Sequence, residues 1–281
     1  MKSQLPAALV VEGNSTSAPV LKLRGIAEEL GPIKSGSLRI ARRVSNFLRA
    51  GYGVSKYEEL QAARLVLLRV PDSSVQRVVD ELCAADLSFE DLAFVLCDTW
   101  FSSDALAPLR MRGSAVASVC EIHTGQQAAF FAVEGQAAAT RPMRKLLDRC
   151  GACSFELKPG TKELLFCAEL LTTALPIPLF VAAQQALRAC GLIGNPLATV
   201  LEGNAQEMFR AFCAGSRLNW GGPLTECSPE LAEHYLDVMR RKLPEVAQVI
   251  DEQLAAARAT ITRSRQTPTC NQPSAAVETV A

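Results

Sequence analysis

The chain has 281 residues, of which 49% are hydrophobic and 21% charged, and its 29 basic and 29 acidic side chains give a formal net charge of zero. This composition excludes a disordered chain or a collagen-like repeat, and the length excludes a small disulfide-stapled domain. A neutral chain also lacks the charge with which proteins coat nucleic acids or anionic membranes. We find no apolar run of the roughly 18 residues that a membrane-spanning helix needs and no secretory signal. We therefore expect a cytoplasmic protein with no nucleic-acid and no membrane partner.

The first half of the chain alternates apolar strands with amphipathic helices. A β-prone run at Ala8–Val11 leads through a loop into a predicted helix over Val20–Leu30, which ends at Gly31-Pro32. Alternating apolar and polar residues over Ser37–Arg43 predict the second strand. Fully apolar strands between helices indicate a mostly parallel sheet covered on both faces. Further strands are expected at Arg64–Val70, Leu92–Cys97, Ala115–Ile122, Ala128–Val133 and Ser154–Leu157, and further helices at Asp72–Leu82, Ser103–Arg112 and Arg141–Arg149.

The second half of the chain, after Gly160, contains only helix signals. From Arg263 the composition turns to Ser, Thr, Pro and Gln, which is typical of a disordered tail. We therefore predict an α/β domain at residues 1–160, an all-helical domain at 161–262 and a tail at 263–281. The helices are expected at Lys162–Thr173, Leu179–Cys190 and Ala198–Cys213, followed by a pair that starts at Ser228-Pro229 and is split by Pro244.

The chain has ten cysteines, most of them inside apolar runs, where a free thiol acts as a small buried hydrophobe. Only Cys150 and Cys153 have the C-x-x-C spacing of redox and zinc sites. Two histidines in the whole chain are too few to complete a zinc site easily, and the motif follows a helix instead of opening one. We interpret it as a structural turn with Gly151 as the helix cap, and a redox site stays as the alternative.

In a doubly wound sheet, the turn after the first strand is where a dinucleotide binds. This turn normally reads G-x-G-x-x-G, because the backbone must approach the diphosphate closely. The stretch Val11–Thr16 keeps only the middle glycine, and Glu12 brings an unfavourable negative charge. The diphosphate-binding candidates are Gly13, Asn14, Ser15 and Thr16.

Arg42 and Arg43 stand at the end of the predicted second strand, where an arginine can hold the extra phosphate of NADP. Two other interpretations remain open. The two arginines could be a solvated pair at the start of a helix, or part of a basic amphipathic helix over Leu38–Arg49 that binds RNA or lipid. The neutral charge of the whole chain disfavours the last interpretation.

Several other polar residues lie where a ligand could bind. Asp98, Thr99 and Ser102 follow the end of a buried strand and could exchange hydrogen bonds with a ligand. Lys162 opens the first helix of the second half, either as an electrostatic anchor in a cleft or as a surface lysine. Glu169 sits among apolar residues of the same helix; if this helix is buried, its carboxyl group is a general-acid candidate, and otherwise it belongs to a surface stripe.

Five short sequence segments follow one another along the chain: Val70-Pro71-Asp72, Ala105–Arg110 with Gly113, Phe131–Gly135, Lys162 at a helix start, and Gly221–Thr225. Over roughly residues 8–260, their order and spacing resemble the Rossmann-like oxidoreductases with a helical C-terminal domain of unknown function. These are distant relatives of pyrroline-5-carboxylate reductase and 6-phosphogluconate dehydrogenase. The resemblance implies NAD(P) binding in the first domain, with Val70, Pro71 and Asp72 at the nicotinamide-side ribose, and dimerisation through the helical domain.

The chain departs from this family where the resemblance places its polar cleft. It has Val119-Cys120 in place of a His-Pro pair, Leu165-Phe166 in place of Tyr-His, and Ala174 in place of Asn. The run Glu226-Cys227-Ser228 also replaces a sequence similar to Arg-Gly-Asp. These substitutions remove groups that could transfer a proton or polarise a carbonyl. The resemblance thus implies a cleft that has become apolar.

We therefore predict an α/β fold with a doubly wound, mostly parallel Rossmann-like sheet, followed by an all-helical domain. The predicted protein binds NADP and exchanges hydride with a small carbonyl or imine substrate, with Lys162 and Glu169 as catalytic candidates. We expect no metal, and a homodimer that forms through the helical domain. The alternative is a catalytically inactive descendant that keeps the fold as a dimeric binding or regulatory module.

Overall fold

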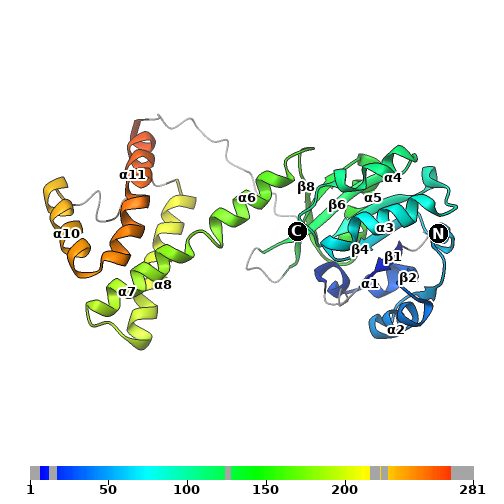
Figure 1. Ribbon diagram of the computed structural model, residues 1–281, viewed down its shortest axis with the longest axis horizontal. Helices are drawn as coiled ribbons and strands as arrows, with labels where there is room; N and C mark the ends of the chain where they lie inside the picture. The colour runs from blue at the N-terminus through cyan, green and yellow to red at the C-terminus, as the bar shows by residue number, and fades with distance from the viewer. Residues whose placement is uncertain (1–6, 13–17, 124–127, 216–221, 223–226, 267–281) are drawn as a thin grey trace, which may run out of the picture. The chain divides into compact units, whose positions relative to one another are not determined.

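The computed structural model describes residues 7–12, 18–123, 128–215, 222 and 227–266. The chain divides into two compact units, Met1–Ala168 and Glu169–Ala281 (Figure 1). This division falls inside helix α6 (Lys162–Thr172), whereas the sequence analysis divides the chain at residue 160. Helix α11 (Pro244–Gln266) continues into the predicted tail, and residues 267–281 lie outside the described residues.

The first unit is built on one eight-stranded sheet with the order β3-β2-β1-β4-β5-β6-β7-β8. Neighbouring strands are parallel except β6 and β7, which are antiparallel. The first six positions have the strand order of a doubly wound dinucleotide-binding sheet, which confirms the predicted fold class. The strands are β1 (Ala7–Val11), β2 (Leu30–Lys34), β3 (Tyr52–Val54), β4 (Leu65–Arg69), β5 (Ala93–Cys97), β6 (Ala115–Ile122), β7 (Phe130–Gly135) and β8 (Cys153–Glu156).

Helices cover both faces of this sheet. Alternate strand residues point to opposite faces, so Leu9 and Val95 belong to one buried cluster and Val10 and Phe94 to the other. The first cluster includes residues of α1 (Ile26–Glu29), α2 (Leu38–Leu48) and α5 (Ala137–Arg149), and the second includes residues of the 3-10 helix η3 (Tyr57–Ala62), α3 (Val75–Ala84) and α4 (Ala107–Met111). The remaining 3-10 helices are η2 (Pro19–Lys22), η4 (Asp72–Ser74), η5 (Phe89–Asp91) and η6 (Ser103–Leu106).

The predicted helix over Val20–Leu30 is wrong. The chain forms only η2 and the four-residue α1 there, and β2 already begins at Leu30. Gly25 lies between η2 and α1 with a φ of +86°, in the left-handed region that interrupts a right-handed helix. Gly31 and Pro32, which we interpreted as a helix end, lie inside β2.

The predicted strand over Ser37–Arg43 is also wrong, because this segment begins helix α2. Ser37 is its N-cap, and the Ser37 hydroxyl accepts a hydrogen bond from the Ile40 backbone N–H at 3.3 Å. Helical spacing places Ala41 and Val44 in the core. The third strand packs tightly against this helix, because a Cβ on Gly53 would lie 2.7 Å from the Arg42 backbone nitrogen.

The described part of the second unit is helical, as the sequence predicts. Its elements after α6 are α7 (Ile177–Ala189), α8 (Gly194–Cys213), α10 (Pro229–Lys242) and α11. The Ser228 hydroxyl accepts a hydrogen bond from the Leu231 backbone N–H at 3.3 Å and so caps α10, as predicted for Ser228-Pro229. Pro244 separates α10 from α11.

The stretch Lys162–Ala189 is long and apolar enough to cross a membrane, with a mean hydropathy of 2.0 over 18 residues, none of which is buried within the structure. This finding corrects our expectation that no segment has such a length and composition. We searched for an unbroken apolar run, whereas an average tolerates Thr172, Thr173 and Pro176. A helix that packs on another protein surface has the same composition, so the pattern alone does not identify what covers it.

Candidate functional site

The candidate site lies beyond the carboxyl ends of the parallel strands of the first unit. An open α/β sheet binds ligands at this edge, where the strand order reverses, here between β1 and β4. Glu12 follows β1, Arg69 ends β4 and Asp98 follows β5. The Glu12 backbone N–H donates to the Arg69 carbonyl oxygen at 3.3 Å, so these two ends are held side by side.

Glu12 carries the charge that the sequence analysis found unfavourable beside a diphosphate. In the structure its carboxylate forms an ion pair with Arg77 of α3, and the same guanidinium lies 2.5 Å from Glu81. The ion pair offsets much of this negative charge. Gly13, Asn14, Ser15 and Thr16 lie outside the described residues, so the predicted diphosphate turn stays a prediction.

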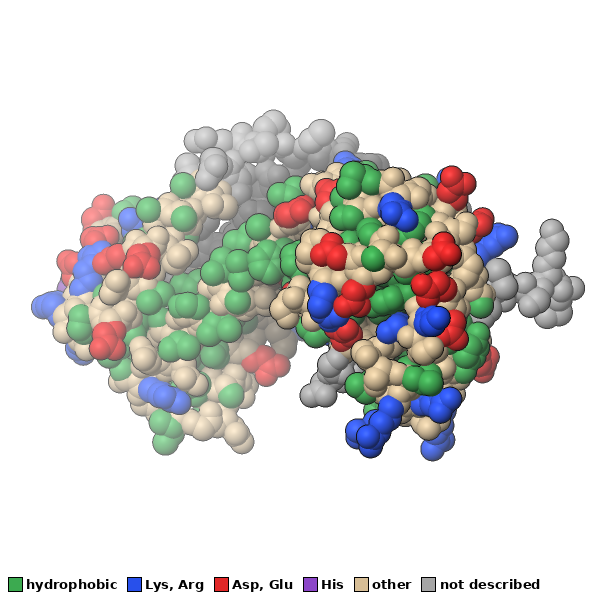
Figure 2. Space-filling model, turned by 45° about the vertical axis from the view of Figure 1, so that its right-hand side comes forward, with side chains coloured by type: hydrophobic (Ala, Val, Ile, Leu, Met, Phe, Trp, Pro, Cys, Tyr) green, Lys and Arg blue, Asp and Glu red, His purple; other side chains and the backbone are tan. Residues whose placement is uncertain are grey.

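Arg42 and Arg43 do not lie at the end of the second strand. Both are exposed on α2, which Figure 1 places at the lower edge of the first unit, and Figure 2 shows Lys and Arg side chains gathered at that edge. Lys34 ends β2 instead, with its Nζ 4.6 Å from the centre of the Tyr57 ring. The next residue, Ser35, donates from Oγ to the Val11 carbonyl at 2.7 Å and joins β2 to the end of β1.

Val70, Pro71 and Asp72 follow β4 at the same edge of the sheet. Val70 is buried, whereas Pro71 and Asp72 are exposed. The Asp72 carboxylate accepts a hydrogen bond from Thr99 Oγ1 at 3.0 Å. Thr99 Oγ1 in turn accepts from the Phe101 backbone N–H at 3.2 Å. Asp72 and Thr99, which were predicted as ligand-binding candidates after two different strands, are thus in direct contact.

Asp98 is the most unusual residue of this edge. Its φ is +54°, and neither carboxylate oxygen has a hydrogen-bond partner among the residues that the structure describes, although the side chain is only 5% exposed. The nearest cation is Arg69, whose Nε lies 3.8 Å from Asp98 Oδ2. Burial raises the pKa of Asp98 to about 6, because loss of water outweighs the opposite effect of Arg69. Arg69 was not among our candidates, although it lies at the end of an apolar strand directly before Val70-Pro71-Asp72.

Lys162 is buried, with only 1% of its surface exposed. Its ammonium group donates to the Phe101 carbonyl oxygen at 2.7 Å and to Ser118 Oγ at 2.8 Å. Ser118 Oγ lies 3.2 Å from Glu134, and the Glu134 carboxylate accepts bonds of 2.8 Å from both the backbone N–H and the hydroxyl of Ser103. These contacts join the start of α6 to β6, β7 and the segment after β5.

The surroundings of Lys162 favour a positioning role. Burial lowers its pKa, whereas Glu134 and the nearby thiol of Cys120 act in the opposite direction. The interpretation of Lys162 as a surface lysine is wrong, because its side chain is enclosed. Glu134 and Ser118, which surround Lys162, were not among the predicted site residues. An acid that directly follows the apolar run Phe131–Val133 was the available signal for Glu134.

Glu169 is half-buried. We considered it a general-acid candidate only if its helix is buried, and this is not the case. Leu164 and Leu171 of α6 are 67% and 62% exposed. The backbone carbonyl of Glu169 accepts a hydrogen bond from Thr173 Oγ1 at 2.6 Å. Its catalytic role stays a prediction.

Cys150 and Cys153 flank the turn between α5 and β8. Cys150 is buried, Cys153 is exposed, and burial raises the pKa of the Cys150 thiol. Gly151 follows the helix with a φ of +73°, the conformation typical of a helix C-terminus, and this agrees with the predicted cap. Among the described residues, no group of three or more His, Cys, Asp or Glu side chains could hold a metal ion.

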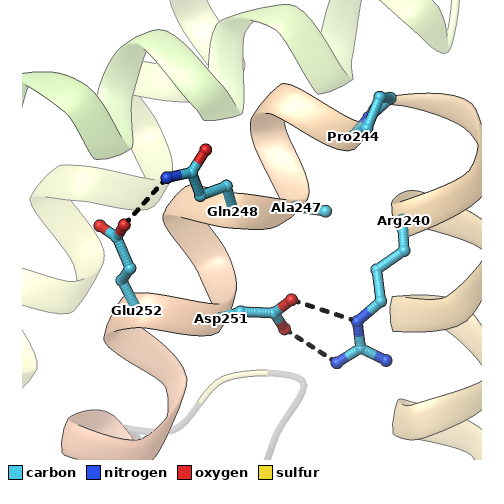
Figure 3. A pocket seen from close by; sticks show the side chains of 6 residues that line it. All are labelled: Arg240, Pro244, Ala247, Gln248, Asp251 and Glu252. Carbon is cyan, nitrogen blue, oxygen red and sulfur yellow. Dashed lines mark hydrogen bonds and ion pairs between the residues drawn. The ribbon is translucent and has the colours of Figure 1, made fainter.

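Two hollows of the second unit lie between helices. One has a volume of about 490 Å³ and is lined by α10 and α11, where Arg240 binds Asp251 through contacts of 3.3 and 2.8 Å (Figure 3). Arg240 also contacts Glu233 and Asp237 of its own helix, so its guanidinium links these α10 carboxylates to Asp251 of α11. The other hollow, of about 380 Å³, is lined by apolar residues such as Leu179, Met208 and Phe212.

The residues at the carboxyl edge of the sheet fit the nicotinamide half of a dinucleotide. The unsatisfied Asp98 oxygens and Arg69 Nε match a ligand that both donates and accepts hydrogen bonds. The diphosphate side of the site fits a dinucleotide less well, because the elements that follow β1, η2 and α1, have only four residues each. They replace the long helix whose N-terminus usually faces the phosphates.

The sequence matches no protein-family model and no curated protein. Solved structures do match its fold. A reductive aminase from Aspergillus terreus in complex with NADPH and ethyl-5-oxohexanoate is 14% identical, with a TM-score of 0.63 over 94% of this chain and 95% of that chain. An imine reductase from Myxococcus stipitatus in complex with NADP+ is 14% identical, with a TM-score of 0.60 over 92% and 93% of the two chains. A pyrroline-5-carboxylate reductase from Coxiella burnetii is 12% identical, with a TM-score of 0.54 over 93% and 98%.

These structures extend over almost the whole of both chains, so they share the sheet and the helical part that follows it. At identities below 25% they establish the fold alone. The chain therefore has the fold of the Rossmann-type NADP oxidoreductases with a helical C-terminal part, the group that its sequence resembles.

Proposed function

We propose that this protein binds NADP(H) and exchanges a hydride with a small carbonyl or imine substrate. The observation that carries the proposal is the strand order, which gathers polar and unsatisfied side chains at the edge where doubly wound sheets bind dinucleotides. Structures of the same fold that contain NADPH or NADP+ support it.

The structure changes the residue that we propose for the 2′-phosphate of NADP. Lys34 ends β2, the position from which a cation reaches this phosphate, and replaces Arg42 and Arg43 as the first candidate. The two arginines on α2 would act through their long-range attraction for a phosphate. Val70, Pro71 and Asp72 would lie along the ribose on the nicotinamide side, and Gly13 to Thr16 along the diphosphate.

The bound cofactor would supply the hydride, and the chain's own residues would position the reactants. We propose Lys162 as a positioning residue, because its ammonium group fixes the Phe101 carbonyl and Ser118 on two neighbouring segments of the site. Glu169 stays a proposed proton donor on the sequence alone, because it lies on a helix whose Leu164 and Leu171 are exposed within one chain. The substrate would be small and weakly polar, since Val119 and Cys120 are apolar and buried where the related family has polar groups.

Titration of the purified protein with NADPH and with NADH tests the proposal. We expect saturable NADPH binding, about tenfold weaker in Lys34→Ala, because a charge-assisted phosphate contact is lost. NADH lacks that phosphate, so its affinity should change little. Arg141→Ala, at an exposed position on α5, is the matched control. No binding of either nucleotide at millimolar concentration would refute the proposal.

A catalytically inactive binding or regulatory module is the second candidate. The buried Val119 and Cys120 favour it, because neither side chain supports proton transfer as a histidine does. The two candidates differ in turnover: the enzyme consumes NADPH with a small imine or ketone, whereas the module binds NADPH without any substrate-dependent loss of its absorbance.

We also propose that the protein is cytoplasmic and forms a homodimer through the apolar surface of its second unit. Large side chains exposed there include Ile177 at 56%, Ile193 at 73%, and Phe209 and Phe212 at 56% each. Exposed apolar patches of this kind on a folded chain mark contact surfaces.

A further inference from the structure

A hydrogen-bond acceptor just after strand β5 and a hydrogen-bond donor at the end of β4 lie next to each other without partners. Both carboxylate oxygens of Asp98 and the Nε of Arg69 are buried without a partner among the described residues. The 3.8 Å between Nε and Oδ2 is too long for a hydrogen bond, and Arg69 uses another nitrogen for the Val70 carbonyl at 3.3 Å. Buried groups without partners are rare, because each loses its bonds to water without replacement.

The backbone of Asp98 is a second, independent observation. Its φ of +54° lies in the left-handed region, which side chains with a Cβ adopt at some cost in energy. The conformation is held by the Asp98 backbone N–H, which donates to the Val119 carbonyl of β6 at 2.9 Å. Asp adopts this conformation more readily than most residues with a Cβ, and here it fixes the direction in which the carboxylate points.

The neighbouring polar groups do not satisfy this pair. Thr99 Oγ1 is already bonded to Asp72 at 3.0 Å. Lys162 donates to the Phe101 carbonyl and to Ser118, and it acts on Asp98 only through its charge. Glu121 also acts only through its charge, which opposes ionisation of Asp98. The Val20 backbone N–H also acts on the Asp98 carboxylate, but it does not reach hydrogen-bond geometry. A ligand that satisfies both Asp98 and Arg69 must therefore offer both a donor and an acceptor.

We propose that Asp98 and Arg69 together bind the carboxamide group of the nicotinamide ring, an inference that rests on the NADP proposal above. A primary carboxamide carries both functions in one plane. Its N–H donates to the Asp98 carboxylate, and its carbonyl oxygen accepts from Arg69 Nε. A phosphate or carboxylate has no donor for Asp98 and is repelled by it, and an ammonium group is repelled by Arg69. Of these ligand groups, the carboxamide is the one that satisfies both residues.

The carboxamide must displace part of what covers Asp98. The 3-10 helix η2 lies against this residue, because the backbone N–H of Val20 helps to lower its pKa against the larger effect of burial. This cover is only four residues long and is separated from α1 by Gly25, whose φ is +86°. Because Val20 and Leu21 of η2 are buried in the core, binding of the carboxamide requires a local shift of this short segment.

Calorimetric titration with two ligands tests the inference. NADPH carries the carboxamide, whereas adenosine 2′,5′-bisphosphate contains the phosphate-bearing adenosine half alone. We expect Asp98→Ala to weaken NADPH binding at least tenfold and Asp98→Asn to weaken it less, because asparagine keeps one acceptor oxygen but loses the charge. Both variants should bind the bisphosphate as the wild type does. Asp104→Ala, whose parent side chain is 73% exposed, is the matched control and should change neither affinity.

The outcomes separate this inference from the NADP proposal. If NADPH affinity is unchanged in both Asp98 variants, or if both ligands lose affinity equally, Asp98 has no contact with the carboxamide and the inference fails, while NADP binding stands. If wild-type protein binds NADPH no better than the bisphosphate, the nicotinamide half contributes nothing and the inference also fails. If neither ligand binds the wild type, both proposals are wrong.

Discussion

At the scale of single residues, Asp98 links the site to the stability of the fold. A carboxyl group that loses water without gaining a donor prefers its neutral form, and burial raises the pKa of Asp98 from its ordinary value of 3.8 to about 6. The folded state therefore holds a proton that the unfolded chain releases between these two values. Stability from this group is greatest at low pH and is lost as the pH rises through about 6.

We predict that Asp98→Asn makes the protein less sensitive to pH. Between pH 5 and 7.5, the wild type should lose about 1–2 kcal/mol of unfolding free energy through Asp98, because the pKa of its carboxyl group is raised by burial. The variant avoids this loss. Urea unfolding of both proteins at the two pH values gives their free energies of unfolding. The difference in stability between wild type and variant should change by this amount from the lower to the higher pH. A difference that is the same at both pH values would show that Asp98 has an ordinary pKa.

Lys162 gives the second residue-scale prediction. Lys162→Met removes the cation beside the buried Glu134 and leaves the Phe101 carbonyl and Ser118 without their donor. Removal of one partner from such a buried arrangement costs about 3–5 kcal/mol, which urea unfolding can measure. Lys145→Met, at an exposed position of α5, should change stability by less than about 0.5 kcal/mol.

A double variant shows whether the charge of Glu134 is the cause. Glu134→Gln neutralises the carboxylate that Lys162→Met leaves uncompensated, so it should recover part of the lost stability. If the double variant is instead as unstable as the sum of the two single changes, the loss comes from packing. Lys162 would then have no electrostatic role in the site.

The sequence could predict these residues only in part. Lys162 and Asp98 were identifiable as charged residues beside apolar segments, and both lie at the edge where a ligand is expected. Their partners Arg69, Ser118 and Glu134 come from other strands. Which strands are neighbours depends on the sheet order, and this order is not encoded in any local pattern.

At the scale of elements, the apolar strands were predicted well and the segment between β1 and β4 was not. Strands β4, β5 and β6 have continuous apolar runs that only a doubly covered sheet explains. By contrast, Ser37–Arg43 fits both an alternating strand and the start of a helix. Its helical form is favoured by the Ser37 cap and by the burial of Ala41 and Val44 on the sheet. Local alternation over a few residues could not reveal this packing.

Two glycines of different elements should respond to alanine in opposite directions. Gly135 ends β7 with a φ of +137°, and a Cβ there would lie 2.4 Å from the Val116 carbonyl oxygen. We expect Gly135→Ala to cost at least about 1–3 kcal/mol from backbone strain alone. Gly203 lies inside α8, and a Cβ there meets no heavy atom within 4 Å. Gly203→Ala should therefore stabilise the protein by about 0.5–1 kcal/mol.

Thermal and urea unfolding of both glycine variants would test this pair. The two glycines lie in different units, so the measured signals must detect the unfolding of each unit. Far-ultraviolet circular dichroism and tryptophan fluorescence should therefore be recorded together. A stable Gly135→Ala would mean that the β6–β7 pairing tolerates a shift that the close contact with Val116 excludes. An unstable Gly203→Ala would mean that this face of α8 is covered by another surface.

At the scale of the whole molecule, composition predicted a folded chain of two parts but not what its second part contacts. The neutral charge and the broken apolar runs predict no role for a membrane. In the structure, Lys162–Ala189 is helical, and no residue of its most apolar 18-residue segment is buried. Such a surface needs a cover, either a second copy of the chain or lipid. The turn with Pro176 separates α6 from α7 within this stretch.

A lysine introduced on this surface should distinguish between a second copy of the chain and lipid as its cover. We expect the wild type to scatter light as a particle of twice the 30.2 kDa chain mass, and Leu171→Lys, at a position 62% exposed, to shift it towards the monomer. Met111→Lys is the matched control, because Met111 is 80% exposed on α4 of the first unit and should leave the mass unchanged. Because Leu171 is exposed within one chain, its replacement by lysine should not unfold the unit. A wild type that is monomeric without detergent would exclude the dimer, and recovery with the membrane fraction would identify lipid as the cover.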